Sequence, residues 1–495
     1  MKPFKILTFL LSVFLMLSVV MLVFPKDGIK INSSNTLYFF RFEDFFTNKT
    51  VKYADISKIL SENVVDTTAT TSGDDNGTDT AKSSKNSLLR RIQHIEYPNN
   101  NPDALYPFFE ALNGIAKGNE LIRVLHYGDS QIEGDRITSF LRFKLQTKFG
   151  GCGSGFTQVN NPAPSVSIAE TPSDNWVKYT LIGRDQPKAS HNRYGAMLGF
   201  SRIALQHKDT TNKDSSMYFG KIFASLTNTS FQNTRSYQRL KLFYGYNRKD
   251  VNVKLYQNKE LLKSETLPAS KALNVLTWDF ESGPSSFSLH FKGKDSPDVY
   301  GFALDGIKGI AIDNIPLRGS SGYGFSQTNF DNLKRFYDLL NVKLVIMQFG
   351  VNAVPENEKT IVPDYSYYEK GFYEQLNTLK KINKDLCIIV IGISDRSRKA
   401  GNYYETNPNI IKIRLAQKNA AFKAGCAYWD LYEAMGGENS MPSWVFAEPA
   451  LANKDFTHFN ESGARIVSEM FYNSLLNDYN EYLKQAGKLF SKAVK

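Results

Sequence analysis

Residues 121–131 read LIRVLHYGDSQ, a short apolar run followed by the triplet Gly128-Asp129-Ser130. The run from Leu121 to Tyr127 predicts a buried strand, because it is hydrophobic and is bounded by a turn signal. A helix is expected to follow, from Arg136 to Lys148. A strand, a tight turn and a helix in this order are typical of an α/β domain, in which functional side chains collect at the carboxyl ends of the strands.

The alternation of helices and strands returns in the C-terminal third of the chain. The elements expected there are helices 326–340, 366–382, 409–424 and 462–475 and strands 342–348, 386–393 and 427–430. One more helix, 103–116, is expected before the first strand. Between Gly155 and Gly306 the pattern consists of short alternating segments separated by turn residues, which predicts antiparallel strands. We therefore expect one α/β domain, residues 89–154 and 307–495, interrupted by an inserted β domain, residues 155–306, that is a β-sandwich or a jelly roll.

The N-terminus is typical of a membrane anchor. Two lysines precede an uninterrupted apolar run from Ile6 to Phe24, long enough to cross a bilayer as a helix. Because a cleaved signal peptide has a shorter apolar core followed by small residues, we expect an uncleaved signal anchor over residues 1–25. The chain is then a single-pass protein of the inner (cytoplasmic) membrane that faces the periplasm or the cell exterior. Residues 26–88 form a juxtamembrane segment, with a flexible polar linker over 65–87.

Composition narrows the choice of partners and cofactors. The formal net charge is +11, but the basic residues are scattered among acidic ones, so we expect no nucleic acid; anionic polymers or membrane headgroups fit this charge. The six histidines form no metal-binding pattern, so no metal and no cofactor are expected. Cys152, Cys387 and Cys426 are too few for a disulfide framework and allow one disulfide and one free thiol.

Two motifs suit nucleophilic catalysis. A turn after the first strand can expose the hydroxyl of Ser130 beside the first N–H groups of the next helix, although a serine there can equally cap that helix. Asp455-Phe456-Thr457-His458 places a carboxylate three residues before an imidazole, which can fix its tautomer and leave Nε2 to accept the serine proton. The alternative is an aspartate that caps a turn and a histidine that faces solvent.

Two loops are candidates for stabilising an oxyanion. Asn352, in Gly350-Val351-Asn352, follows an expected strand and can present its amide at the same sheet edge as Ser130. The glycine-rich stretch 318–324 lies just before a helix, so the N–H of Gly322 is a second candidate donor. Each loop can also be a simple turn.

The ordered set Gly128-Asp129-Ser130, Gly322, Gly350-x-Asn352 and Asp455-x-x-His458 resembles the four blocks of the SGNH (GDSL) hydrolase superfamily. Over residues 90–155 and 307–485 this resemblance implies a flavodoxin-like three-layer fold with an ester-cleaving serine hydrolase site. It implies that Ser130 is the nucleophile, that His458 is the general base and that Asp455 orients it. It also implies an oxyanion hole formed by the Ser130 N–H, Gly322 and Asn352.

A second glycine cluster competes for the second block. It comprises Gly151, Gly153 and Gly155. We prefer Gly322, because it closely precedes a helix in the resumed α/β pattern.

The inserted β domain, together with Trp429-Asp430 and Ala434-Met435-Gly436-Gly437, resembles bacterial peptidoglycan O-acetylesterases, whose inserted module is carbohydrate-binding-like. This resemblance implies removal of O-acetyl groups from a cell-envelope glycan. Gln131 departs from the residues more usual after the nucleophile. We expect the insert to bind polysaccharide through exposed aromatic residues, with Trp176, Tyr244 and Trp278 as candidates. Core packing is the alternative for these residues, and we prefer it for each one taken singly.

Other functions fit the same features. Acetyl transfer to the same glycan uses the same acyl-serine, and the membrane location allows a membrane acyltransferase as partner. A lipase or lysophospholipase would use the same fold with an apolar acyl groove. A glycan-binding protein without catalysis would keep the anchor and the β domain.

Overall fold

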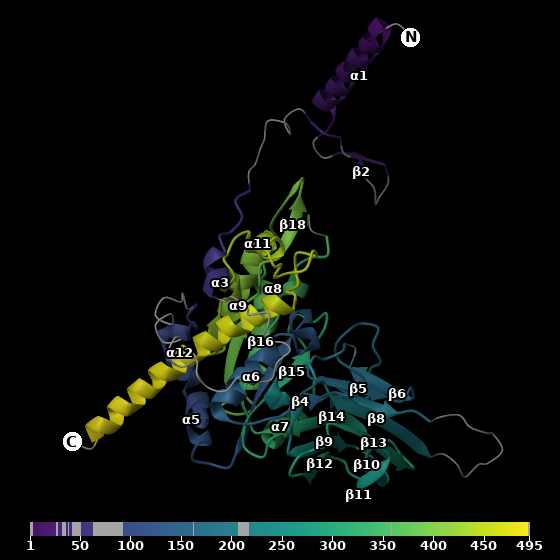
Figure 1. The fold of residues 1–495 in the computed structure, drawn as a ribbon, viewed down its shortest axis with the longest axis vertical. Coiled ribbons are helices and arrows are strands. Elements are labelled where there is room, and N and C mark those ends of the chain that lie inside the picture. The colour runs from purple at the N-terminus through teal and green to yellow at the C-terminus, as the bar shows by residue number, and fades with distance from the viewer. Residues whose placement is uncertain are drawn as a thin grey trace, which may run out of the picture. The chain divides into compact units, whose positions relative to one another are not determined.

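The computed structural model describes residues 3–25, 28–31, 36–37, 39–41, 51–62, 93–161, 163–205, 217–357 and 359–493. The expected linker over 65–87 lies outside these residues. The chain forms two compact units, residues 1–52 and 53–495. Figure 1 shows the elements of both.

The N-terminal unit contains a long apolar helix. Helix α1 (Pro3–Val23) has 21 residues, none of them buried, and is apolar enough to cross a membrane. At 1.5 Å per residue it is about 31 Å long, which matches the hydrocarbon thickness of a bilayer. A membrane span and a signal sequence share these properties. A short antiparallel pair, β1 (Ile29–Lys30) and β2 (Thr36–Leu37), follows it.

The second unit is built on a parallel sheet of five strands in the order β15-β3-β16-β17-β20. The strands are β15 (Gly309–Pro316), β3 (Leu121–Gly128), β16 (Val342–Gln348), β17 (Cys387–Ile391) and β20 (Ala427–Trp429). Every neighbouring pair is parallel. The carboxyl ends of the five strands therefore lie at one edge of the sheet, as expected from the sequence.

Helices cover both faces of this sheet and make three layers. Helices α5 (Tyr106–Ile115), α6 (Thr138–Phe149) and α12 (Glu461–Ala493) pack on one face, and α7 (Phe330–Leu340), α8 (Ser366–Lys380) and α9 (Asn409–Lys423) pack on the other. Successive buried residues of β16 alternate between the two faces, because side chains of a strand point in opposite directions. The expected three-layer α/β fold is thus confirmed.

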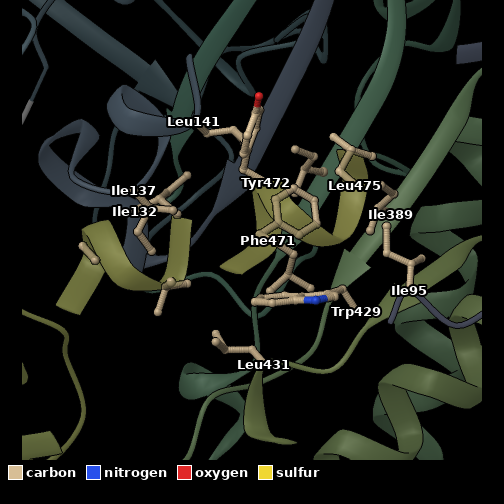
Figure 2. Close-up of a cluster of buried hydrophobic side chains, with 14 of the residues drawn as sticks. Ile95, Ile132, Ile137, Leu141, Ile389, Trp429, Leu431, Phe471, Tyr472 and Leu475 are labelled. Atoms are coloured by element: carbon tan, nitrogen blue, oxygen red, sulfur yellow. The ribbon is translucent and has the colours of Figure 1, made fainter. Parts of the chain in front are cut away.

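The face under α12 is held by aromatic packing (Figure 2). The indole of Trp429 lies 5.3 Å from the ring of Phe471, centroid to centroid, in an edge-on arrangement. Its Nε1 donates hydrogen bonds to the Gln93 carbonyl and to Ser474 Oγ, so the buried polar atom is satisfied. This packing fixes the C-terminal helix on the sheet directly after the loop that carries His458.

Two antiparallel sheets lie between β3 and β15 in the chain. One has the order β11-β10-β13-β8-β5, and the other the order β12-β9-β14-β7-β6, with β4 paired to β14. The strands are β4 (Gly155–Thr157), β5 (Ile168–Pro172), β6 (Trp176–Thr180), β7 (Gly199–Ile203), β8 (Tyr218–Leu226), β9 (Arg239–Gly245), β10 (Val251–Gln257), β11 (Glu260–Leu267), β12 (Leu273–Asp279), β13 (Ser286–Gly293) and β14 (Asp298–Asp305). One hydrophobic cluster draws on both sheets, so they pack face to face as a sandwich. The bounds 155–306 of the insert remain a prediction.

The remaining elements are short. Strands β18 (Ser397–Ala400) and β19 (Tyr403–Thr406) form a hairpin. The short α-helices are α3 (Ser57–Glu62), α10 (Leu431–Ala434) and α11 (Ser440–Val445). The 3₁₀ turns are η3 (Pro98–Asn100), η4 (Pro102–Leu105), η5 (Ser130–Asp135), η6 (Gln232–Arg235) and η7 (Val351–Ala353).

Several element bounds differ from the sequence-based expectation. Helix α7 begins at Phe330 rather than at residue 326, because the side chain of Asn329 accepts a hydrogen bond from the Asn332 N–H and caps it. Helix α12 continues to Ala493, well beyond residue 475. Strand β15 was not expected, because its apolar run is interrupted by Asp313 and Asn314.

None of the three candidate sugar-binding aromatic residues of the insert is exposed, and each packs in the core, which was the preferred alternative for each taken singly. Trp176, Tyr244 and Trp278 are 4%, 5% and 4% exposed and belong to the core between the two sheets. Large aromatic side chains gain more free energy from burial than from exposure, unless a ligand covers them.

A buried ion network ties the sandwich to the parallel sheet. The Arg123 guanidinium on β3 donates to the carboxylates of Asp313 on β15 and Asp305 at the end of β14, and all three side chains are inaccessible to solvent. The core is also continuous across the junction: Phe336 of α7 stacks on Phe243 and meets Tyr300 edge-on, with centroids 5.6 and 4.8 Å apart. The sandwich and the α/β layers therefore support each other.

We expect Asp305→Ala to lower the free energy of unfolding by about 3–5 kcal/mol, because it leaves the buried charge of Arg123 with one partner fewer. The matched control is Asp338→Ala, which removes the half-exposed partner of Lys334 on α7 and should cost less than about 1 kcal/mol. Chemical denaturation measures both. Equal losses in the two variants would contradict a supporting role for the buried network.

Candidate active site

Ser130 lies at the carboxyl end of β3, in the central part of the sheet. The turn is tight because Gly128 has no side chain: a Cβ there would lie 2.9 Å from the carbonyl oxygen of Gln348 on β16. Asp129 caps the following turn, since its Oδ1 accepts a hydrogen bond from the Gln131 N–H at 3.0 Å. Burial raises the pKa of Asp129 to about 7. The cap is therefore Asp129, and the Ser130 hydroxyl serves another contact.

That contact is with His458. Ser130 Oγ lies 2.7 Å from His458 Nε2, and His458 Nδ1 lies 2.7 Å from Asp455 Oδ2. The other carboxylate oxygen of Asp455 accepts the backbone N–H groups of Thr457 and His458, both at 3.0 Å. The structure thus brings together the three residues expected as nucleophile, base and orienting acid. Ser130 and His458 are partly exposed, so a substrate can reach both.

The loop fixes the charge of Asp455. Partial burial alone would raise the pKa of this carboxyl, but the hydrogen bonds from the side chain and backbone of His458 and from the Thr457 N–H outweigh it and lower the pKa to about 2. Asp455 is therefore ionised at neutral pH. An ionised acceptor at Nδ1 keeps the proton there and leaves Nε2 free to accept the serine proton.

Gln131 joins the serine turn to the histidine loop. Its Nε2 donates to the Thr457 carbonyl at 2.7 Å, and its Oε1 accepts the Phe459 N–H at 3.4 Å, so it holds both residues that flank His458. Its side chain is buried. In the sequence, Gln131 stands out only because other residues are more usual directly after the nucleophilic serine. The available signal was a polar side chain at a position that directly follows a buried strand and turn.

Asn352 lies on η7, the turn that follows β16 and Gly350. Its Nδ2 donates to the carbonyl oxygen of Ser320 at 3.1 Å. This contact connects the expected third block to the glycine-rich stretch 318–324. One N–H of the exposed Asn352 amide therefore holds this loop, the amide has a second donor, and its role as an oxyanion donor stays a prediction.

Gly322 is packed and its amide is engaged. Its N–H donates to Ser320 Oγ at 3.0 Å, and a Cβ at this position would lie 2.7 Å from the Phe372 ring. Its φ of +95° favours glycine. Gly319 in the same loop is exposed, and a Cβ there would meet no atom within 4 Å. The assignment of Gly322 as a donor stays a prediction, and a substrate would have to displace Ser320 Oγ to use its N–H.

The competing glycine cluster lies elsewhere. A Cβ on Gly151 would lie 2.5 Å from the carbonyl of Ile310, near the amino-terminal end of β15. The carboxyl end of that strand, Pro316, pairs with Gly128 beside Ser130. Gly151 is therefore near the end of the sheet opposite to the serine.

Arginines surround the triad and hold its loops. Arg136 donates to the Phe459 carbonyl at 3.1 Å, and Arg396 donates to the Val351 carbonyl at 3.1 Å. Arg318 is largely exposed and lies 3.4 Å from Glu133.

The site suggests neither a metal nor a disulfide in the part of the chain that the structure describes. No group of three or more His, Cys, Asp or Glu side chains is placed to hold a metal ion there. The three cysteines are free thiols. Burial raises the pKa of the Cys387 thiol to about 11 and that of Cys426 to about 12.

Comparison with known proteins identifies a solved structure with a similar fold. No family model matches the chain, and no curated protein matches it. Among solved structures, a peptidoglycan O-acetylesterase superposes with a TM-score of 0.60 at 20% identity, over 77% of this chain and 98% of that one. An acetyl xylan esterase matches with a TM-score of 0.26 at 16% identity over 33% of this chain and 81% of its own. A family two carbohydrate esterase from Cellvibrio japonicus matches with a TM-score of 0.22 at 8% identity, over 64% of this chain and 100% of its own.

The match to the O-acetylesterase spans nearly all of that protein. It therefore covers both the parallel sheet with its helices and strands that belong to the sandwich. Together with the position of Ser130 at the carboxyl end of β3, this match shows that the chain has the fold of the SGNH (GDSL) hydrolases.

Proposed function

We propose that the protein is a serine esterase that removes O-acetyl groups from a cell-envelope glycan such as peptidoglycan or another exopolysaccharide. The observation that carries this proposal is the hydrogen-bonded chain from Ser130 through His458 to Asp455. An acid, an imidazole and a serine in this order activate the hydroxyl for attack on an ester carbonyl.

The reaction would proceed through an acyl-serine. Ser130 Oγ attacks the acetyl carbonyl carbon while His458 Nε2 takes the hydroxyl proton, and His458 then gives this proton to the departing sugar oxygen. Water next attacks the acyl-serine, with His458 again accepting a proton, and acetate leaves as Ser130 is restored. The negative charge that develops on the carbonyl oxygen would be stabilised by the Ser130 N–H and Asn352.

The glycan as substrate is supported by charge and by likeness of fold. An acetyl group offers few atoms to bind, so the specificity of such an enzyme must come from the sugar polymer. The formal net charge of +11 suits a polymer that carries carboxylates. A protein that superposes with a TM-score of 0.60 is a peptidoglycan O-acetylesterase by name.

We also propose that α1 anchors the chain in the inner membrane, with residues 26–495 in the periplasm or outside the cell. Lysines before an apolar span favour this orientation. Such an anchor would keep the site close to the envelope glycan. Neither the described residues nor the structural neighbours support a membrane acyltransferase as partner, and we do not propose one.

Ser130→Ala and His458→Ala should each abolish the release of acetate from O-acetylated peptidoglycan, because both groups take part in bond making. Thermal unfolding should change little, since both side chains are partly exposed. Ser286→Ala on β13 is the matched control and should keep full activity. The wild-type protein should hydrolyse short acyl esters faster than long ones.

Undiminished turnover in Ser130→Ala would contradict the mechanism. A preference for long acyl chains would instead favour a lipase. Acetyl transfer is distinguished by supplying an acetyl donor and a deacetylated oligosaccharide: free acetate should form faster than the acetylated sugar. The opposite order would replace hydrolysis by transfer.

Gln131→Leu should lower kcat by about tenfold to hundredfold and change KM little, because the substitution releases the backbone on both sides of His458 without touching the substrate. Steady-state kinetics on a small acetyl ester measures this. Gln146→Leu removes a comparably buried glutamine on α6, far from the triad, and should reduce stability without this kinetic effect. Equal kcat values for Gln131→Leu and Gln146→Leu would show that Gln131 does not position the base.

Asp455→Asn should destabilise the fold at pH 6 and lose this effect in acid. The pKa of Asp455 in the folded protein, about 2, lies below the value of 3.8 for an unperturbed aspartate. The carboxylate therefore contributes stability that is present above about pH 4 and is lost as pH falls through about 2. Denaturant unfolding of both proteins from pH 6 down to pH 3 should show the difference shrinking. A constant difference over this range would contradict the ionised, hydrogen-bonded carboxylate.

A further inference from the structure

The first residues of the second unit pack close to the loop that carries the triad acid and base. The Ala54 N–H donates to the Asn439 carbonyl oxygen at 3.2 Å, and the Ala54 carbonyl oxygen accepts from Ser443 Oγ at 2.7 Å. Ile56 is buried and belongs to the hydrophobic cluster on the α12 face of the parallel sheet. The expected juxtamembrane segment 26–88 therefore includes residues that are part of the core of the second unit.

Four aromatic side chains extend this contact to the triad loop. Tyr53 stacks on Phe446 with ring centroids 6.1 Å apart, and Phe446 meets Phe456 edge-on at 5.7 Å. Tyr404 on β19 stacks on Phe456 at 3.6 Å with ring planes 12° apart, and its N–H donates to the Tyr53 hydroxyl at 3.4 Å. These four residues, which we call the aromatic cluster, form a closed set of contacts that connects the first residue of the unit to the triad loop.

Phe456 lies inside the triad loop and has an unusual backbone conformation. It is buried, and its φ of +54° is rare for a bulky side chain. In the turn that it forms, Asp455 Oδ1 accepts the N–H groups of Thr457 and His458, both at 3.0 Å. The Phe456 carbonyl oxygen accepts the Ser397 N–H of β18 at 3.1 Å. A left-handed phenylalanine persists only where its surroundings determine the conformation, and the aromatic cluster supplies such surroundings.

The segments that supply the rings are also joined by hydrogen bonds. The Asn439 side chain accepts the Thr406 N–H of β19 at 2.8 Å, and the Asn439 N–H donates to Thr406 Oγ1 at 2.7 Å. The carbonyl oxygen of the same asparagine accepts the Ala54 N–H. Figure 1 shows α3, α11 and β18 in the same part of the second unit. Displacement of the first residues of this unit would therefore disturb the strand of Tyr404 as well as the ring of Phe446.

We propose that the aromatic cluster positions the triad loop, and that the chain segment leading from the N-terminal unit supplies an essential part of it, Tyr53. The inference rests on the proposed function, since it assigns these rings a part in the same ester cleavage. The rings act on the backbone between Asp455 and His458 rather than on the substrate. A shift of about 1 Å in a catalytic group can lower the rate by about a hundredfold, so a small movement of the loop is sufficient.

Two other roles for the cluster predict different results. If the rings only attach the N-terminal segment, their loss lowers the thermal midpoint and leaves kcat unchanged. If Phe446, which is 57% exposed, binds the substrate, its loss raises KM. A positioning role lowers kcat even for a small ester, because the base rather than the substrate is displaced.

The test measures kcat and KM of the full chain, in detergent micelles, for a small acetyl ester. Tyr53→Ala and Phe446→Ala should each lower kcat by about fivefold to fiftyfold and change KM by less than about twofold. Tyr404→Leu removes the flat ring and should lower kcat similarly, whereas Tyr404→Phe keeps the ring and should retain most of the wild-type kcat. Tyr53→Ala combined with Tyr404→Leu should be about as slow as the slower single variant, because both remove the same support.

The matched control is Tyr482→Ala. This half-buried tyrosine packs edge-on against Tyr106 at 5.0 Å and lies on α12, far from the first turn of that helix. Its loss should leave kcat within about twofold of the wild type, because the ring is remote from the triad loop.

Hydrogen exchange, measured by mass spectrometry on the peptide that covers residues 453–459, gives a readout that does not require turnover. The amides of this peptide should exchange about tenfold faster in Tyr53→Ala, because the loop opens more often without its support. Tyr482→Ala should leave their exchange unchanged.

Unchanged kcat in both Tyr53→Ala and Phe446→Ala would overturn the proposal. Equal losses of kcat in Tyr404→Leu and Tyr404→Phe would also overturn it, because ring contact would then not matter. A wild-type protein that hydrolyses no ester would contradict the proposed function, and the exchange rates would then decide separately whether the cluster holds the loop. Unchanged exchange of residues 453–459 in Tyr53→Ala would show that it does not.

Discussion

The hydrogen bond between Ser130 and His458 joins residues that are 328 positions apart, and the arrangement of the fold decides whether it can form. Ser130 is placed by β3 and by a glycine turn that has no room for a side chain. His458 is placed by a loop that ends where α12 begins to pack beside α6, with Arg465 over the ring of Phe140. Gln131 restrains the position of His458 further, because its side chain hydrogen-bonds the backbone on both sides of this histidine.

The sandwich is integrated with this framework. The Arg123 side chain extends from β3 to Asp305 at the end of the last sandwich strand, and Phe336 of α7 packs on sandwich aromatics. Strand β3 carries Arg123 and ends just before Ser130. The same strand therefore contacts the sandwich and positions the serine.

The sequence predicted those features that depend on short-range patterns. The strand before Ser130 and the strand 342–348 were found because buried parallel strands are continuous apolar runs. Strand β15 was missed, because its Asp313 reads as a turn residue unless its buried partner Arg123 is known. Which aromatic residues of the insert are exposed could not be predicted either, since exposure depends on which sheet faces which.

The features of the site also divide into those that the local sequence predicts and those that depend on three-dimensional packing. The spacing of Asp455 and His458 is local, and it was sufficient to predict their contact with each other. The engagement of the Gly322 amide by Ser320 and the bridging role of Gln131 depend on side-chain orientation, which no spacing encodes.

The most direct measurement of the central claim is labelling of the folded chain with a fluorophosphonate, followed by mass spectrometry of the modified peptide. The triad activates one hydroxyl, so we expect a single adduct on Ser130 that is lost in His458→Ala. An adduct on another residue, or equal labelling of Ser130 in His458→Ala, would contradict it.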